Sequence, residues 1–329
     1  MACLLGCSEV ANKPAPALKG DAPLFRFMQI NDTHVHAGRG AYSKVNDKFR
    51  WLVAAADSSA YFPRPDFLIG VGDLIEGGTL EDLAPDTRLL LEMLKPLHVP
   101  LYPVMGNHEV VQREGDPKFE QAYREAFGNE RVNYTFMHGG VMFIALNNGG
   151  AGCAIEPAVI KARNEWLRQE LEHNKDVPKI IFCHVPLVPL REEKVFVKSF
   201  GFRNDYDRDG GTLSVIERHA DTVIAVLSGH FHLTGMAQKS GIFHISISGT
   251  ASYPCDYALY TAFPDRIEVA VRQIPPELVT RNTDIHGKPR HPVDYVDENH
   301  KTHEEYVSGR PEERDFTIPL TGRKRPNRE

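Results

Sequence analysis

The stretch FRFMQINDTHVH, residues 25–36, decides how this chain folds. It begins as an apolar run of strand length and ends in polar residues with carboxylate and imidazole side chains. Four later runs share this form, since each is rich in Val, Ile, Leu or Phe and ends at Gly, Asn, Asp or His. Together the five runs predict strands at Phe25–Ile30, Phe67–Val71, Leu101–Met105, Lys179–Cys183 and Val223–Leu227.

Helical patterns alternate with these strands, which is typical of an α/β protein. We expect helices at Val45–Ala60, Pro85–Leu94, Lys118–Phe127, Pro157–His173 and Leu213–His219. Further short runs predict a hairpin of Asn133–Met137 and Val141–Asn147, and an antiparallel meander of Ile242–Ser248, Tyr257–Phe263 and Arg266–Val271. The sheet system is therefore expected to be mixed.

The residues that follow the five strands are of types that bind metal ions. Ligands bind at the carboxyl edge of an open α/β sheet, so we expect these side chains to lie together. They supply two carboxylates, one amide and four imidazoles: Asp32, His34, Asp73, Asn107, His184, His230 and His232. One ion takes about four to six ligands, so seven residues with a shared carboxylate predict two ions.

The types of candidate ligand restrict which metal ions the predicted site can bind. The 5 cysteines are widely spaced and contain no Cys-x-x-Cys pair, which argues against a disulfide framework and a zinc ribbon. Mixed nitrogen and oxygen ligands favour Fe, Mn or Zn, and the imidazoles argue against Mg or Ca. Two such ions about 3.5–4 Å apart can hold a phosphoryl group and ionise a water molecule at neutral pH.

The ordered blocks D-x-H, G-D, G-N-H-[DE], H and G-H-x-H, from Asp32 to His232, resemble the calcineurin-like metallophosphoesterase family. The resemblance implies a four-layer αββα sandwich with two mixed sheets and a dinuclear metal site at the carboxyl ends of the strands. It further implies the division of the ligands. Asp32, His34 and His232 match those of the first metal, Asn107, His184 and His230 match those of the second, and Asp73 matches the bridging carboxylate.

His108, in Gly106-Asn107-His108-Glu109, matches the family's non-ligand histidine beside the leaving group. A histidine there can protonate a departing alkoxide near neutral pH. Glu109 stands where Asp is commoner in the family, and we expect it to orient His108 or its loop. The predicted activity is hydrolysis of a small-molecule phosphoester, and the D-T-H block most resembles the cyclic-nucleotide and glycerophosphodiester phosphodiesterases.

Several alternatives stay open. A phosphomonoesterase or a nucleotide pyrophosphatase of the same family would use the same ligands, although a purple acid phosphatase would place a tyrosine near Asp73. The pair His34 and His36 also resembles the H-x-H of metal-dependent amidohydrolases, which are barrels. A non-catalytic metal-binding scaffold is the third alternative, but such members lose a ligand or the histidine at position 108.

The segment Leu187–Gly211 follows His184 directly and is expected to overhang the metals. Four of its side chains are candidates for contact with a substrate phosphate: Arg191, Arg203, Tyr206 and Arg208. The loop Asp205–Gly210 looks like the start of a calcium loop. However, position twelve would fall on Ile216, so we interpret it as an acidic loop.

Charge excludes one class of partner. The formal net charge is −6, from 38 Lys+Arg and 44 Asp+Glu, whereas proteins that neutralise nucleic-acid phosphates carry a basic excess. The hydrophobic fraction of 42% and the charged fraction of 25% are ordinary globular values. No run approaches the ~18 apolar residues of a transmembrane helix. The oligomeric state is not predicted.

The two termini differ from the rest in composition. Residues 1–23 are expected to be a tether or a signal remnant, since Leu4-Leu5-Gly6-Cys7 resembles a bacterial lipobox. A signal needs an apolar stretch of ~7–15 residues, which favours a cytoplasmic protein and leaves an exported lipoprotein as the alternative. Residues 24–274 form the predicted metallophosphoesterase domain. Residues 275–329 contain 7 prolines and are predicted to be a polar, extended or partly ordered extension.

Overall fold

Strand β1 (Phe25–Ile30) is the apolar run that opens the fold, and it lies in the interior of a six-stranded mixed sheet. The computed structural model describes residues 22–38, 42–111, 113–150, 156–200, 211–281 and 295–320. In that sheet β1 pairs in parallel with β2 and antiparallel with β10. The strand order is β12 (Asp315–Pro319), β11 (Arg266–Gln273), β10 (Asp256–Ala262), β1, β2 (Phe67–Val71) and β3 (Leu101–Val104).

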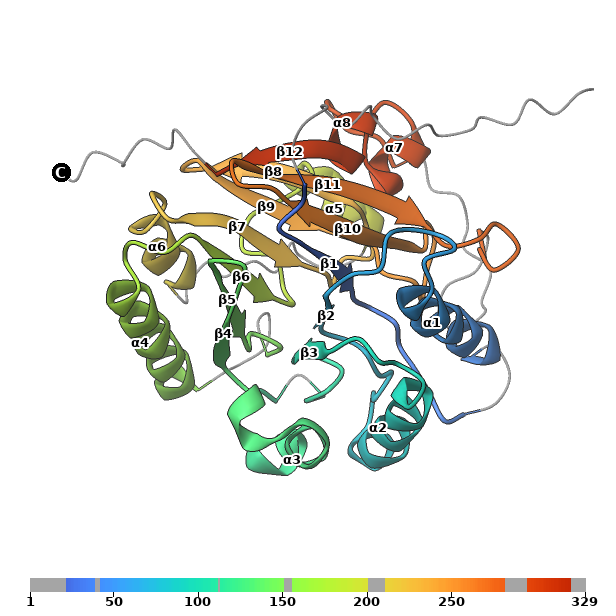
Figure 1. Ribbon diagram of the computed structural model, residues 1–329. Coiled ribbons are helices and arrows are strands. Elements are labelled where there is room, and N and C mark those ends of the chain that lie inside the picture. Colours follow the sequence, from blue (N-terminus) through green and yellow to red (C-terminus); the bar gives the residue numbers. More distant parts are fainter. Residues whose placement is uncertain are drawn as a thin grey trace, which may run out of the picture.

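A second six-stranded sheet packs on the first (Figure 1). Its strand order is β4 (Tyr134–His138), β5 (Val141–Leu146), β6 (Lys179–Cys183), β7 (Val223–Ser228), β9 (Ile242–Ser246) and β8 (Gly235–Lys239). The space between the sheets is filled with aromatic and aliphatic side chains, because both inner faces are apolar. Phe27 of β1 stacks on Tyr260 of β10 with ring centroids 4.4 Å apart, and it meets Phe143 of β5 edge-on at 5.6 Å.

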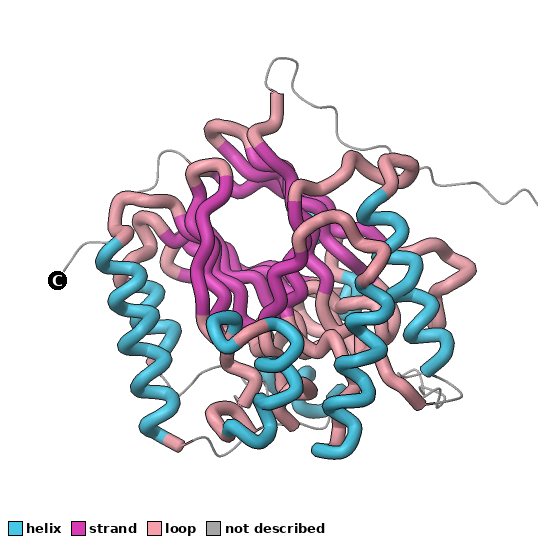
Figure 2. The backbone as a smooth tube through the Cα atoms, turned by 60° about the horizontal axis from the view of Figure 1, so that its bottom comes forward, coloured by secondary structure: helices cyan, strands magenta, loops and turns pink. Residues whose placement is uncertain are grey.

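Helices cover the outer faces of both sheets, as Figure 2 shows. Those after β1 and β2, α1 (Tyr42–Asp57) and α2 (Leu80–Leu94), bury side chains such as Phe49 and Leu90 against the first sheet. On the second sheet, α4 (Pro157–His173) and α6 (Thr212–Glu217) bury Leu167 and Ile216. The expected αββα sandwich with two mixed sheets is therefore confirmed.

The remaining helices are α3 (Pro117–Phe127), α5 (Glu193–Phe200), α7 (His303–Ser308) and α8 (Pro311–Arg314). Among the described residues, none of the helices has both the length and the apolar character that crossing a bilayer requires. The helix predicted at Pro157–His173 has the expected bounds, and the other predicted helices differ from the observed ones by a few residues at their ends.

The predicted antiparallel meander is partly wrong. β10 and β11 pair antiparallel as expected, but β9 lies in the other sheet, where it runs parallel to β7. The sequence pattern could not distinguish these cases, because all three runs carry apolar residues that suit either sheet. β8 and α5 were not predicted.

Part of the predicted polar C-terminal extension, residues 295–320, forms secondary structure on the domain. β12 adds to the edge of the first sheet beside β11, and α7 buries Tyr306 completely. Few apolar residues suffice here because buried polar side chains and backbone pairing hold this segment. The predicted N-terminal tether up to residue 21 lies outside the described residues, as do residues 282–294 and 321–329.

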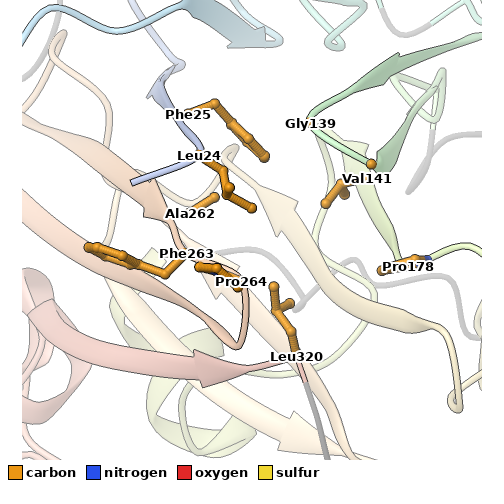
Figure 3. A pocket seen from close by; sticks show the side chains of 10 residues that line it. Leu24, Phe25, Gly139, Val141, Pro178, Ala262, Phe263, Pro264 and Leu320 are labelled. Atoms are coloured by element: carbon orange, nitrogen blue, oxygen red, sulfur yellow. The ribbon is translucent and has the colours of Figure 1, made fainter. Parts of the chain in front are cut away.

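An apolar cavity of about 230 Å³ lies where the parallel strands begin (Figure 3). Its lining includes Leu24 and Phe25 at the start of β1, Val141 at the start of β5, and Pro178 just before β6. Because the candidate ligands follow the carboxyl ends of these strands, the cavity lies at the opposite end of the sandwich. Its lining side chains offer no ionisable group for catalysis.

Candidate metal centre

Five loops bring the predicted site residues together. β1, β2 and β3 are parallel neighbours in one sheet, and β6 and β7 are parallel neighbours in the other. The loops that follow them meet at one edge of the sandwich, which is where α/β folds bind ligands. All eight predicted residues lie there: Asp32, His34, Asp73, Asn107, His108, His184, His230 and His232.

The first donor group consists of Asp32, His34 and His232, whose ligand atoms all lie within 4.8 Å of one another. His34 and His232 come from different sheets, yet their Nε2 atoms are 3.1 Å apart. Asp32 Oδ1 lies 3.1 Å from His232 Nε2. All three side chains are buried or nearly so, so the group is sheltered from solvent.

The second donor group consists of Asp73, Asn107, His184 and His230. Asn107 Oδ1 lies 3.1 Å from His184 Nε2 and 2.8 Å from His230 Nδ1. Asp73 Oδ2 lies 3.0 Å from His184 Nε2. The same oxygen is 3.9 Å from His34 Nε2 in the first group, so the Asp73 carboxylate lies between the two groups.

The backbone is strained at the ligands themselves. Left-handed φ angles occur at Asp32 (46°), His34 (45°), Asp73 (50°), His230 (72°) and His232 (51°). Such conformations cost non-glycine residues about 1–3 kcal/mol each and persist where surrounding contacts enforce them. Five strained residues at one edge indicate that the fold is built around this group of side chains.

The ionisation states suit a metal. Burial and the neighbouring His184 lower the pKa of His230 to about 3, and burial together with His108 lowers the pKa of His34. The pKa of Asp73 lies well below its usual value: burial would raise it, but the charges on His184 and His108 outweigh that effect. Neutral imidazoles and ionised carboxylates are the forms that coordinate metal ions.

The pKa of His184 indicates that the site requires a positive charge. Burial opposes a charge on this imidazole, but Asp73 and Asp32 outweigh burial and raise its pKa to about 10. The buried carboxylates therefore require a nearby positive charge, which a proton on His184 supplies when no cation does. A metal ion can take that role, so the donor set fits metal binding in both atom type and charge.

In three of the candidate ligand histidines, the ring nitrogen that faces away from the donor groups also has a hydrogen-bond partner. His34 Nδ1 lies 2.8 Å from Glu76 Oε2, and His184 Nδ1 donates to the Val71 carbonyl over 3.0 Å. His232 Nδ1 bonds to the Ser252 hydroxyl. Partners of this kind fix the tautomer and orientation of a metal-ligating histidine. Glu76 and Ser252 were not predicted, and only Glu76 had a signal, three residues after Asp73 in the same loop.

His108 lies beside both donor groups and belongs to neither. Its side chain is 26% exposed, its Nε2 is 3.9 Å from Asp73 Oδ2, and its Nδ1 bonds to the Glu76 carbonyl. Although burial lowers the pKa of His108, Asp73 and Glu76 outweigh that effect and raise it. The position and the charge suit a proton donor at the mouth of the site.

Glu109 positions backbone rather than the His108 ring. Its carboxylate accepts N–H groups of Asp73 (2.9 Å), Leu74 (2.7 Å) and Gly106 (2.7 Å). It thereby ties the loop after β2 to the loop after β3, which carry Asp73 and Asn107. Asn148 has a comparable role that was not predicted, because its amide forms two hydrogen bonds with the backbone of Val185, next to His184.

Two other predictions are settled by contacts. His36 Nδ1 lies 2.9 Å from Asp86 Oδ2 and outside both donor groups, and the fold is no barrel, so the amidohydrolase alternative is wrong. The prediction that Arg191 contacts a substrate phosphate is also wrong, because its buried guanidinium donates to the carbonyls of Leu190, Thr234 and Tyr306. The other three candidates, Arg203, Tyr206 and Arg208, lie outside the described residues.

Comparison with known proteins connects this site to a family. The model of the family described as calcineurin-like phosphoesterase matches residues 25–233. An Arcobacter nitrofigilis protein named as a probable glycerophosphodiester phosphodiesterase is 26% identical over 209 residues, which cover 62% of this chain and 71% of that protein. A probable cyclic nucleotide phosphodiesterase of Rhodococcus erythropolis is 24% identical over 234 residues, covering 71% and 73% of the two chains.

Solved structures share the fold. A dimetal phosphatase from Danio rerio superposes with a TM-score of 0.58 at 16% identity, covering 77% of this chain and 97% of that one. Purple acid phosphatase PPD1 from yellow lupin seeds gives 0.53 at 12% identity, covering 90% and 53%. The αββα arrangement is thus found in proteins of very different sequence.

Proposed function

The chain belongs to the calcineurin-like phosphoesterase family, and from this premise we propose that it hydrolyses phosphodiesters at a centre of two metal ions. It is a metal-dependent phosphoester hydrolase. The observation that carries the dinuclear proposal is the position of Asp73 Oδ2, 3.0 Å from His184 Nε2 and 3.9 Å from His34 Nε2. One carboxylate oxygen thereby faces both donor groups.

Asp32, His34 and His232 would hold one ion, Asn107, His184 and His230 the other, and Asp73 would bridge them. When bound, such a pair of ions supplies Lewis-acid activation of the phosphoryl group and of the attacking water. Fe, Mn and Zn are the candidates, because imidazole nitrogens predominate and no thiolate is among the donors. Buried cations on a protein of net charge −6 would also give an anionic phosphoester a local positive site.

His108 acts on the leaving group in this proposal. Its Nδ1–H donates to the Glu76 carbonyl, which fixes the ring and directs Nε2 toward Asp73 and the centre. In the imidazolium form, Nε2 carries the proton that the departing alkoxide oxygen needs. The raised pKa of His108 favours that form near neutral pH.

The preference for diesters rests on the two relatives, which are named for glycerophosphodiester and cyclic-nucleotide substrates. Both substrates are phosphodiesters, which leave an alcohol oxygen on hydrolysis. That leaving group requires a proton, in agreement with a histidine at position 108. The physiological substrate would accordingly be a small molecule with one phosphodiester bond.

The test combines metal analysis with an activity panel. Purified protein reconstituted with Mn, Fe or Zn is assayed on bis(p-nitrophenyl) phosphate, p-nitrophenyl phosphate and cyclic AMP. We expect about two metals per chain and a higher kcat/KM for the diester than for the monoester. A higher kcat/KM for the monoester would favour a phosphomonoesterase, and a fully metallated protein inactive on all three would contradict the proposal.

A further inference from the structure

Residues 295–314 lie beside the loop that carries His230 and His232, although they fall outside the part of the chain that matches the family model. This segment contains α7 and α8, and Figure 1 shows both helices next to β12 and β8. The loop after β7 runs from Gly229 into β8, and its last residue is hydrogen-bonded to Val307 of α7. The residue at this junction is Thr234.

Thr234 is completely buried and held through all of its polar atoms. Its backbone N–H donates to the Val307 carbonyl over 2.9 Å, and its own carbonyl accepts from Arg191 Nη2 over 2.6 Å. Its hydroxyl donates to Asp256 Oδ2 over 2.7 Å. A residue with this many fixed contacts has little freedom to move.

The partners of Thr234 depend on the C-terminal segment. Val307 belongs to α7, and Arg191 Nε donates to the Tyr306 carbonyl of the same helix over 2.8 Å. Asp256 is completely buried and receives two bonds from Arg314 of α8, at 2.8 and 3.0 Å. Bidentate pairs of this kind are strong and geometrically specific.

His232 is two residues before Thr234 and needs this support. Its φ of 51° is left-handed, and such strain persists only where the surroundings enforce it. On either side of His232, Phe231 and Leu233 are buried in a small apolar cluster with Phe196 of α5. The loop is thus held by apolar packing on one side and by the Thr234 network on the other.

We propose that residues 295–314 form a C-terminal clamp that positions His232 through Thr234 and so sets the metal affinity of the first donor group. The inference rests on the proposed metal centre but concerns the clamp alone. The second donor group has supports that do not involve the clamp: Asn148 and the Val71 carbonyl hold the region of His184, and Asp32 Oδ2 accepts the backbone N–H of His230 over 2.9 Å. Weakening the clamp should therefore affect one ion and spare the other.

Two variants interrupt the network at different points. Thr234→Val preserves shape but removes the hydroxyl that bonds Asp256, and Arg314→Met removes the bidentate partner of Asp256. Thr234→Ser retains the hydroxyl and should rescue binding. Thr317→Val is the matched control, because Thr317 is exposed on β12 in the same part of the chain.

The measurement is titration of the metal-free, full-length chain with Mn²⁺ by calorimetry, with EPR of the loaded protein. Loss of a positioning partner typically weakens metal affinity 10- to 100-fold. We expect one of two Mn²⁺ affinities to fall about tenfold in Thr234→Val and Arg314→Met, with the other affinity unchanged. The EPR signal of a coupled Mn pair should give way to that of isolated Mn²⁺ at substoichiometric loading.

The possible results of the titration test the clamp and the metal centre separately. Unchanged affinities in both variants, or equal loss at both sites, would overturn the clamp while leaving the proposed function intact. A wild-type chain that binds no Mn²⁺ would overturn the centre and the clamp together. If circular dichroism shows that Thr234→Val does not fold, Arg314→Met decides, since it acts at the outer end of the network.

Discussion

His34 Nε2 lies 3.1 Å from His232 Nε2, although the two residues are 198 positions apart and follow strands of different sheets. His34 Nδ1 faces the Glu76 carboxylate over 2.8 Å, so a neutral His34 carries its proton there and presents the lone pair of Nε2 to His232. The burial that lowers the pKa of His34 disfavours the proton. The contact therefore favours a metal ion held between the two sheets.

Asp73→Ala should abolish both metal binding and turnover. The Asp73 carboxylate lies between the donor groups, so its loss removes a ligand from each and leaves His184 without its nearest negative partner. Elemental analysis should show well under one metal per chain. Two metals retained in this variant would contradict the bridging role, and Asp47→Ala, at an exposed position on α1, serves as the control.

His108→Ala should retain the metals and lose turnover. The His108 side chain acts on the leaving group in our account, and loss of a general acid typically lowers kcat by about 10²- to 10⁴-fold. The effect should shrink for substrates whose leaving group is a weak base, such as p-nitrophenolate, compared with an alkyl leaving group. An equal loss for both leaving groups would speak against proton donation.

Glu109→Gln should destabilise the fold at the site. One carboxylate oxygen accepts from Asp73 and Gly106 and the other from Leu74 and Ile75, so an amide nitrogen in either place leaves two buried N–H groups unpaired. We expect a loss of about 3 kcal/mol in the free energy of unfolding. Urea denaturation measures this loss, and Glu125→Gln at an exposed position of α3 should change little.

His244 should make the protein less stable in acid. It is buried in β9, neither of its ring nitrogens has a hydrogen-bond partner among the described residues, and burial, followed by Lys239, lowers its pKa to about 4. His244 binds a proton at a higher pH in the unfolded chain than in the folded one. Its contribution to the free energy of unfolding is therefore complete above pH ~6.5 and is lost as the pH falls toward 4. At pH 5 the loss from this group is about 2 kcal/mol.

Replacing the imidazole removes this dependence. Between pH 7.5 and pH 5, His244→Leu should lose about 2 kcal/mol less unfolding free energy than the wild-type chain. Denaturant titrations at the two pH values, in metal-free buffer, measure the difference. The same loss in both proteins would mean that the folded chain protonates His244 as readily as the unfolded one.

The parallel strands and the ligands could be predicted from the sequence for one physical reason. A buried parallel strand requires a short apolar run, and its carboxyl end is where polar side chains can meet, so Phe25–Ile30 followed by Asp32 and His34 indicates both fold and site. His184 shows the same signal after Lys179–Cys183. Local pattern and function coincide at these positions.

The supporting residues could not be predicted, because their roles depend on contacts between distant segments. Ser252 meets His232, and Arg314 of α8 meets Asp256 of β10, only because the packed sheets bring these distant segments together. The C-terminal segment looked like a polar extension because several of its buried side chains are polar, among them Asp297, His300 and Glu313. His300, for example, is buried between Asp297 and Glu313, at 2.8 and 2.9 Å.

The central claim is that the Asp73 carboxylate lies between two metal sites and bridges them. Anomalous diffraction from crystals grown with Mn²⁺ tests it most directly, because the peaks locate each ion independently of activity. Our account predicts two peaks about 3.5–4 Å apart, one beside Asp32, His34 and His232 and one beside Asn107, His184 and His230, with Asp73 Oδ2 between them. A single peak, or a pair that Asp73 does not contact, would contradict it.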